Sequence, residues 1–132
     1  DAGIERADQE PHFVRRFGEF TARLYALEAL LARGTAIIDQ AYAATEITRD
    51  AAAQASLTVA AAKALAQEFA VEIASGIFEL TGTSGTDSDA NLDRHWRNVR
   101  VHSLHDPARW KYVHLGNHTL RGTRPPRLGL VL

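Results

Sequence analysis

The 132 residues of this chain include no cysteine and no methionine. Without cysteine the chain can form neither a disulfide nor a thiolate metal site, which fits a protein of the cytoplasm. The chain also begins with aspartate instead of methionine, so we expect it to be a piece of a longer protein.

An excess of charge of one sign and long apolar runs are absent as well. The formal net charge is −1, so the overall charge favours neither nucleic acid nor an anionic membrane as a partner. No apolar run approaches the roughly 20 residues of a membrane-spanning helix, and no signal peptide opens the chain. Hydrophobic residues make up 45% and charged residues 23%, as in ordinary globular domains, so we expect a single folded domain.

Two long helices are predicted by the spacing of the large apolar residues. From about residue 13 to residue 42 they recur at intervals of three and four, which is one face of an α-helix. A second segment, from about 48 to 80, begins with Thr48 as a helix cap and is rich in alanine, which favours helix. The short connection predicts an antiparallel hairpin, and we expect both apolar stripes to form the core.

Two shorter helices are expected in the last third of the chain. One runs from about residue 91 to 101 or a little beyond. Asp106 before Pro107 is a typical helix start, so another helix should begin there with the Asp106 carboxylate as its cap. The sequence therefore predicts an all-α antiparallel four-helix bundle over residues 1–120, with two long and two shorter helices, and an extended tail over 121–132.

A loop of glycine and hydroxyl residues follows the second long helix. Gly82, Thr83, Ser84 and Gly85 could hold a phosphate or a ribose through backbone N–H groups and side-chain hydroxyls. The alternative is a helix C-cap at Gly82 followed by an ordinary connection, and composition alone favours this alternative.

Five of the six histidines lie between His95 and His118, beside both tryptophans. Because histidine titrates near neutral pH, this density favours proton chemistry or ligand binding. His102 and His105 are three residues apart, and His114 and His118 are four apart, spacings that can place two metal ligands on one helix face. No glutamate completes a His-Glu-x-x-His arrangement, so we do not predict a metal site.

Residues 91–107 read NLDRHWRNVRVHSLHDP and are followed by Trp110, Lys111 and Tyr112. This segment resembles the C-terminal part of flavin-dependent monooxygenases built on the acyl-CoA dehydrogenase fold, the dibenzothiophene monooxygenase group above all. Residues 17–24, FGEFTARL, are similar to the opening of the C-terminal helical domain in that family. The resemblance implies that the chain is the C-terminal helical domain of a longer flavoenzyme, inactive by itself.

At the joint before the last helix the chain departs from the acyl-CoA dehydrogenases themselves. Many of them carry a Tyr-Glu-Gly-Thr run whose glutamate removes a proton from the thioester, whereas this chain has HDPA at 105–108. The monooxygenase group uses a histidine at the position of His105. The resemblance therefore implies His105 as a catalytic residue, with His102 orienting it or contacting the flavin. Asp106 would be the base only in a dehydrogenase, and a carboxylate engaged as a helix cap is a poor base.

The resemblance also implies the cofactor and the partners. The cofactor would be reduced flavin, FMN in preference to FAD, delivered by a separate reductase, and residues 82–85 lie where the dehydrogenases contact their flavin. The reaction would transfer one oxygen atom from O₂ to a sulfur or nitrogen atom of a small molecule, in a homotetramer. Two alternatives stay open, an acyl-CoA dehydrogenase domain and a non-catalytic helical oligomerisation domain.

Overall fold

The computed structural model describes residues 6–127, which are helical throughout apart from the connections. The elements are η1 (Ala7–Gln9), α1 (Pro11–Ala43), α2 (Arg49–Thr81), η2 (Gly82–Thr86), α3 (Asp93–His105) and α4 (Ala108–Arg121). No strand occurs among the described residues. The predicted all-α fold, with two long and two shorter helices, is confirmed. None of the described helices is long and apolar enough to cross a membrane.

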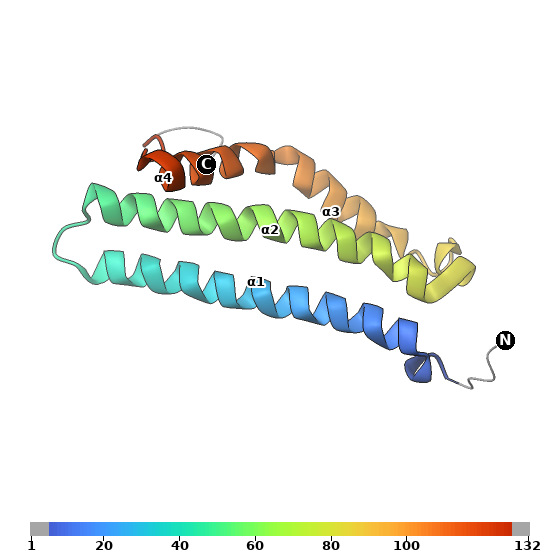
Figure 1. Ribbon diagram of the computed structural model, residues 1–132. Coiled ribbons are helices and arrows are strands. Elements are labelled where there is room, and N and C mark those ends of the chain that lie inside the picture. Colours follow the sequence, from blue (N-terminus) through green and yellow to red (C-terminus); the bar gives the residue numbers. More distant parts are fainter. Residues whose placement is uncertain (1–5, 128–132) are drawn as a thin grey trace.

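The central element of the fold is α2. The antiparallel α1 packs along one side of it, and α3 and α4 run back along the other side (Figure 1). Since α2 has neighbours on both sides, its buried residues are mostly small: Ala53, Leu57, Thr58, Ala60, Ala64, Gln67 and Gly76. Small side chains let neighbouring helices approach closely. The closest approach is at Gly76, where an added Cβ would lie 2.6 Å from the ring of Phe20.

The apolar stripe of α1 is only partly buried. Phe20 faces α2 and is 6% exposed, but Phe17, Leu31 and Tyr42 are 53%, 62% and 77% exposed. The prediction that the whole stripe is core is therefore wrong for the described residues. The physical reason is that α1 packs mainly against α2, so one side of the rod stays uncovered.

The helix ends agree with the local sequence signals at α2 and differ at α3 and α4. The Thr48 hydroxyl accepts a hydrogen bond from the Ala51 N–H at 3.1 Å, and Gly82 ends α2 with a φ of +61°. α3 begins at Asp93 and ends at His105, four residues past residue 101. Of the segment predicted as a tail, Arg121 still belongs to α4, residues 122–127 contain no helix, and 128–132 lie outside the described residues.

Candidate functional site

His102 and His105 lie on the last turn of α3, and both are exposed. His102 lines a groove of about 370 Å³ between α2 and α3, here called the α2–α3 groove, together with Lys63, Gln67 and Asn98. Grooves in which a few polar groups converge beside apolar walls are the usual form of small-molecule sites. The end of α3 therefore offers two imidazoles to a group that approaches from outside the domain.

Asp106 lies next to His105 and does not cap α4, so this prediction is wrong. The residue before α4 is Pro107, and no side chain caps the helix. The Oδ2 atom of Asp106 accepts hydrogen bonds from the ammonium groups of Lys63 and Lys111, the latter at 2.8 Å. Hydrogen bonds from Lys111 and Lys63 hold the pKa of Asp106 below its usual range. The carboxylate is a poor base, as predicted, but because of two lysines and not of backbone N–H groups.

The two partners of Asp106 are the only lysines of the chain, beside thirteen arginines. Lys111 is completely buried, and the side chain of Lys63 is 40% exposed. Gln67, one turn beyond Lys63 on α2, donates a hydrogen bond from Nε2 to the backbone carbonyl of Asp106 at 3.1 Å. The sequence analysis did not predict this cluster. Lys63 could have indicated it, because it is the one charged residue in the otherwise uncharged stretch 51–67.

The glycine-rich loop forms η2, and both glycines have a structural explanation. Gly82 has the left-handed φ that ends α2, and an added Cβ at Gly85 would overlap the side chain of Thr81. Thr83 and Ser84 are exposed. The 13 residues of α3, about 20 Å in length, separate this loop from His105. The structure therefore does not bring the loop and the histidine pair into one pocket.

The other histidine pair, His114 and His118, lies on α4. His118 Nε2 is 3.1 Å from the side-chain nitrogen of Gln54 on α2. The His114 Nε2 and His118 Nδ1 atoms are buried without a hydrogen-bond partner in the described part of the chain. Between residues 6 and 127, no group of three or more histidine, aspartate or glutamate side chains is arranged to hold a metal ion.

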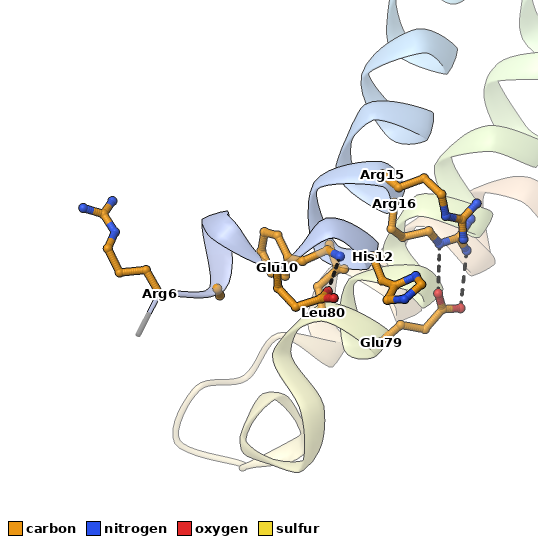
Figure 2. A pocket seen from close by; sticks show the side chains of 9 residues that line it. Arg6, Glu10, His12, Arg15, Arg16, Glu79 and Leu80 are labelled. Atoms are coloured by element: carbon orange, nitrogen blue, oxygen red, sulfur yellow. Dashed lines mark hydrogen bonds and ion pairs between the residues drawn. The ribbon is translucent and has the colours of Figure 1, made fainter. Parts of the chain in front are cut away.

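A second polar cleft, of about 490 Å³, lies where the start of α1 meets the end of α2. Figure 2 shows the Arg16 guanidinium facing the Glu79 carboxylate, with hydrogen bonds of 2.8 and 3.3 Å. Arg16 also donates to Glu19 at 2.9 Å, and Arg15 pairs with the same carboxylate. Because these cations are paired with carboxylates, the cleft is a structural ion network. It lies about 18 Å along α2 from Gln67, well away from the histidines.

The chain resembles known proteins over nearly its whole length. Residues 1–110 match the family described as acyl-CoA dehydrogenase, C-terminal domain. The chain is 38% identical over 125 residues to dibenzothiophene monooxygenase of Rhodococcus erythropolis, an alignment that covers 94% of this chain and 30% of the relative. It is 32% identical to the probable FMNH₂-dependent monooxygenase SfnC of Pseudomonas putida, over 89% of this chain and 30% of the relative.

The fold matches solved structures equally well. The complex of TdsC, a dibenzothiophene monooxygenase from a Paenibacillus species, with FMN and indole has a TM-score of 0.88 and 30% sequence identity. That match covers 94% of this chain and 31% of the other. The chain thus spans about a third or less of the length of these relatives. Sequence, helix order and fold agree, and the chain belongs to the acyl-CoA dehydrogenase C-terminal domain family.

Proposed function

We propose that the chain is the C-terminal domain of a flavin-dependent monooxygenase that oxygenates a sulfur- or nitrogen-containing small molecule. The observation that carries the proposal is the exposure of His102 and His105 at the end of α3. It is supported by 38% identity to dibenzothiophene monooxygenase across 94% of the chain. Exposed imidazoles next to an engaged carboxylate suit oxygen transfer better than proton removal by Asp106.

The side chains at the end of α3 fit the polar edge of a flavin by their chemistry. The exposed imidazoles of His102 and His105 can hydrogen-bond the polar edge of an aromatic ring system. Of the relatives, SfnC is a probable FMNH₂-dependent monooxygenase, and TdsC forms a complex with FMN and indole. We therefore infer reduced FMN, delivered by a separate reductase. When bound, reduced flavin supplies the electrons that activate O₂.

Each histidine has a separate task in this proposal. His105 would hold, on one imidazole nitrogen, the proton that O₂ takes up as it is reduced, so that the second oxygen atom can leave as water. His102, one helical turn earlier, orients His105 or hydrogen-bonds the flavin edge. The exposed hydroxyls of Thr83 and Ser84 stay candidates for cofactor contacts, but the whole length of α3 separates them from His105, so they would reach a different part of the site.

The dehydrogenase alternative has less support. It would need Asp106 as the base that removes the thioester proton, and the hydrogen bonds from Lys111 and Lys63 keep its pKa below the usual range. A carboxylate stabilised in this way accepts a proton poorly near neutral pH. A purely structural domain would leave the exposed pair on α3 without a task.

We also propose that the uncovered face of α1 is an assembly surface. A shallow apolar groove of about 580 Å³ follows this face and is lined by Phe13, Val14, Phe17, Gly18 and Tyr25. Contiguous apolar surface of this kind marks protein contacts. We expect self-association, as a homotetramer in the longer protein, and a cytoplasmic location. Light scattering should find oligomers that Phe17→Asp dissociates, and a strict monomer at high concentration would contradict this.

The oxygenase proposal is tested in the longer protein that carries this chain, with reduced FMN, O₂ and dibenzothiophene. His105→Ala should lower product formed per reduced flavin by about 10²–10⁴-fold, the usual contribution of a general acid or base, and should release hydrogen peroxide instead. His95→Ala, on the first turn of α3, is the matched control and should leave the yield unchanged. Anaerobic bleaching of bound flavin by an acyl-CoA would contradict the proposal and favour the dehydrogenase.

A further inference from the structure

Four side chains from two helices and a connection meet at the joint between α3 and α4. Lys63, Gln67, Asp106 and Lys111, here called the joint cluster, are linked by three hydrogen bonds that all end on Asp106. Both lysines of a chain with thirteen arginines are used on one carboxylate. A lysine ammonium is a compact charge on a flexible stem, so two of them can reach one oxygen from different helices.

The cluster holds Asp106 by its side chain and by its backbone. Lys63 and Gln67 are four residues apart, on one face of α2. The first binds the carboxylate and the second binds the backbone carbonyl, at 3.1 Å. Asp106 itself has the extended dihedral angles φ −137° and ψ 98°, which end α3. Asp106, where the chain changes direction, thus accepts two hydrogen bonds from α2 and one from α4.

Stability alone does not account for this arrangement. Lys111 is fully buried, and burying charges carries a desolvation cost that their mutual attraction often fails to recover. Apolar side chains of the same size would hold α2 and α4 together at least as well. A network of directional hydrogen bonds also fixes Asp106 in one position. It thereby fixes His105, the residue before it in the chain.

We propose that the joint cluster is a positioning device that fixes where His105 and His102 lie at the end of α3. His105 precedes Asp106 directly, and His102 shares the groove with Lys63 and Gln67. Any shift of the joint moves both imidazoles. A displacement of about 1 Å at a reacting group can reduce a rate about 10²-fold. The inference rests on the proposed function, and it gives Lys63, Gln67, Asp106 and Lys111 a positioning role that acts on the histidines through the helix joint.

The test uses the longer protein and measures product and hydrogen peroxide per reduced FMN consumed, with dibenzothiophene as substrate. Lys63→Met and Gln67→Met leave the buried Lys111–Asp106 pair intact, so both variants should fold. We expect each to lower the product yield at least about tenfold, with the missing oxygen recovered as hydrogen peroxide. Lys63→Arg keeps a cation within reach of Asp106 and should restore most of the yield.

Asp50→Asn is the matched control. It breaks another ion pair of α2, to Arg124 at 2.5 Å, in an exposed position away from α3, and should leave the yield unchanged. All yields are compared at the same interval below each variant's Tm. If Lys63→Met and Gln67→Met keep the wild-type yield while His105→Ala loses it, the positioning role is refuted and the proposed function stands. If His105→Ala also keeps the yield, the proposed function itself fails.

A loss of yield that merely follows stability would equally overturn the inference. It would be recognised by a yield that falls in proportion to Tm in every variant, with no recovery in Lys63→Arg. The same conclusion would follow if Asp50→Asn lowered the yield as much as Lys63→Met does.

Discussion

The buried pair of Asp106 and Lys111 should dominate the stability of the helix joint. Asp106→Asn keeps the shape of the side chain but removes its charge, and leaves a fully buried ammonium facing an amide. Removing one partner of a buried pair costs about 3–5 kcal/mol, because the other charge stays behind uncompensated. A lost helix cap would cost only about 1 kcal/mol. For a domain of this size a loss of about 3–5 kcal/mol corresponds to a fall in Tm of roughly 10–20 °C.

The assay is urea and thermal unfolding of the 132-residue chain, followed by far-ultraviolet circular dichroism. Lys111→Met removes the buried cation, so the double variant Asp106→Asn, Lys111→Met should recover about 2 kcal/mol or more relative to Asp106→Asn alone. Asp50→Asn, which breaks an exposed pair, should leave Tm nearly unchanged. The reasoning is refuted if Asp106→Asn costs no more than Asp50→Asn, or if the double variant shows no recovery.

Three further outcomes follow from single residues. Because Lys111 and Lys63 lower the pKa of Asp106 from 3.8, its stabilisation should be complete above about pH 4 and be lost as the pH falls through the folded-state pKa. The difference in the free energy of unfolding between wild type and Asp106→Asn, measured with urea, should therefore become smaller as the pH falls. Burial and the Glu68 carboxylate raise the pKa of Tyr112 to about 12. An ultraviolet titration should therefore show one tyrosine that ionises at a higher pH than the others, and this step should be absent in Tyr112→Phe. Gly18→Ala should stabilise α1 by about 1 kcal/mol, because its Cβ meets nothing, whereas Gly76→Ala should destabilise by about 1–3 kcal/mol through overlap with Phe20. Equal effects in the two glycine variants would contradict this helix packing.

The long helices could be predicted because their signals are local. The three- and four-residue spacing in α1 and the alanine content of α2 act within one or two turns. Thr48 and Gly82 behave as predicted because a helix cap involves only neighbouring backbone groups. The histidines on α3 could be found as candidates for the same reason, since their number and spacing are properties of one segment.

The role of Asp106 could not be read from its neighbours. An aspartate before a proline favours a helix cap, but its carboxylate is drawn instead to Lys63, which lies 43 residues earlier in the chain, and to Lys111. Two ammonium groups in a buried site attract a carboxylate more strongly than backbone N–H groups do. Only the packing of α3 and α4 on α2 brings them within reach.

The apolar face of α1 likewise depends partly on the sequence and partly on the tertiary structure. The sequence by itself determined which side of the helix is apolar, because that depends on spacing alone. Which part of that side is buried was decided by the tertiary structure, in which α2 covers Phe20 and leaves Phe17 and Leu31 exposed. A periodic pattern shows which face of a helix is apolar. Which element packs on that face depends on how segments far apart in the sequence come together.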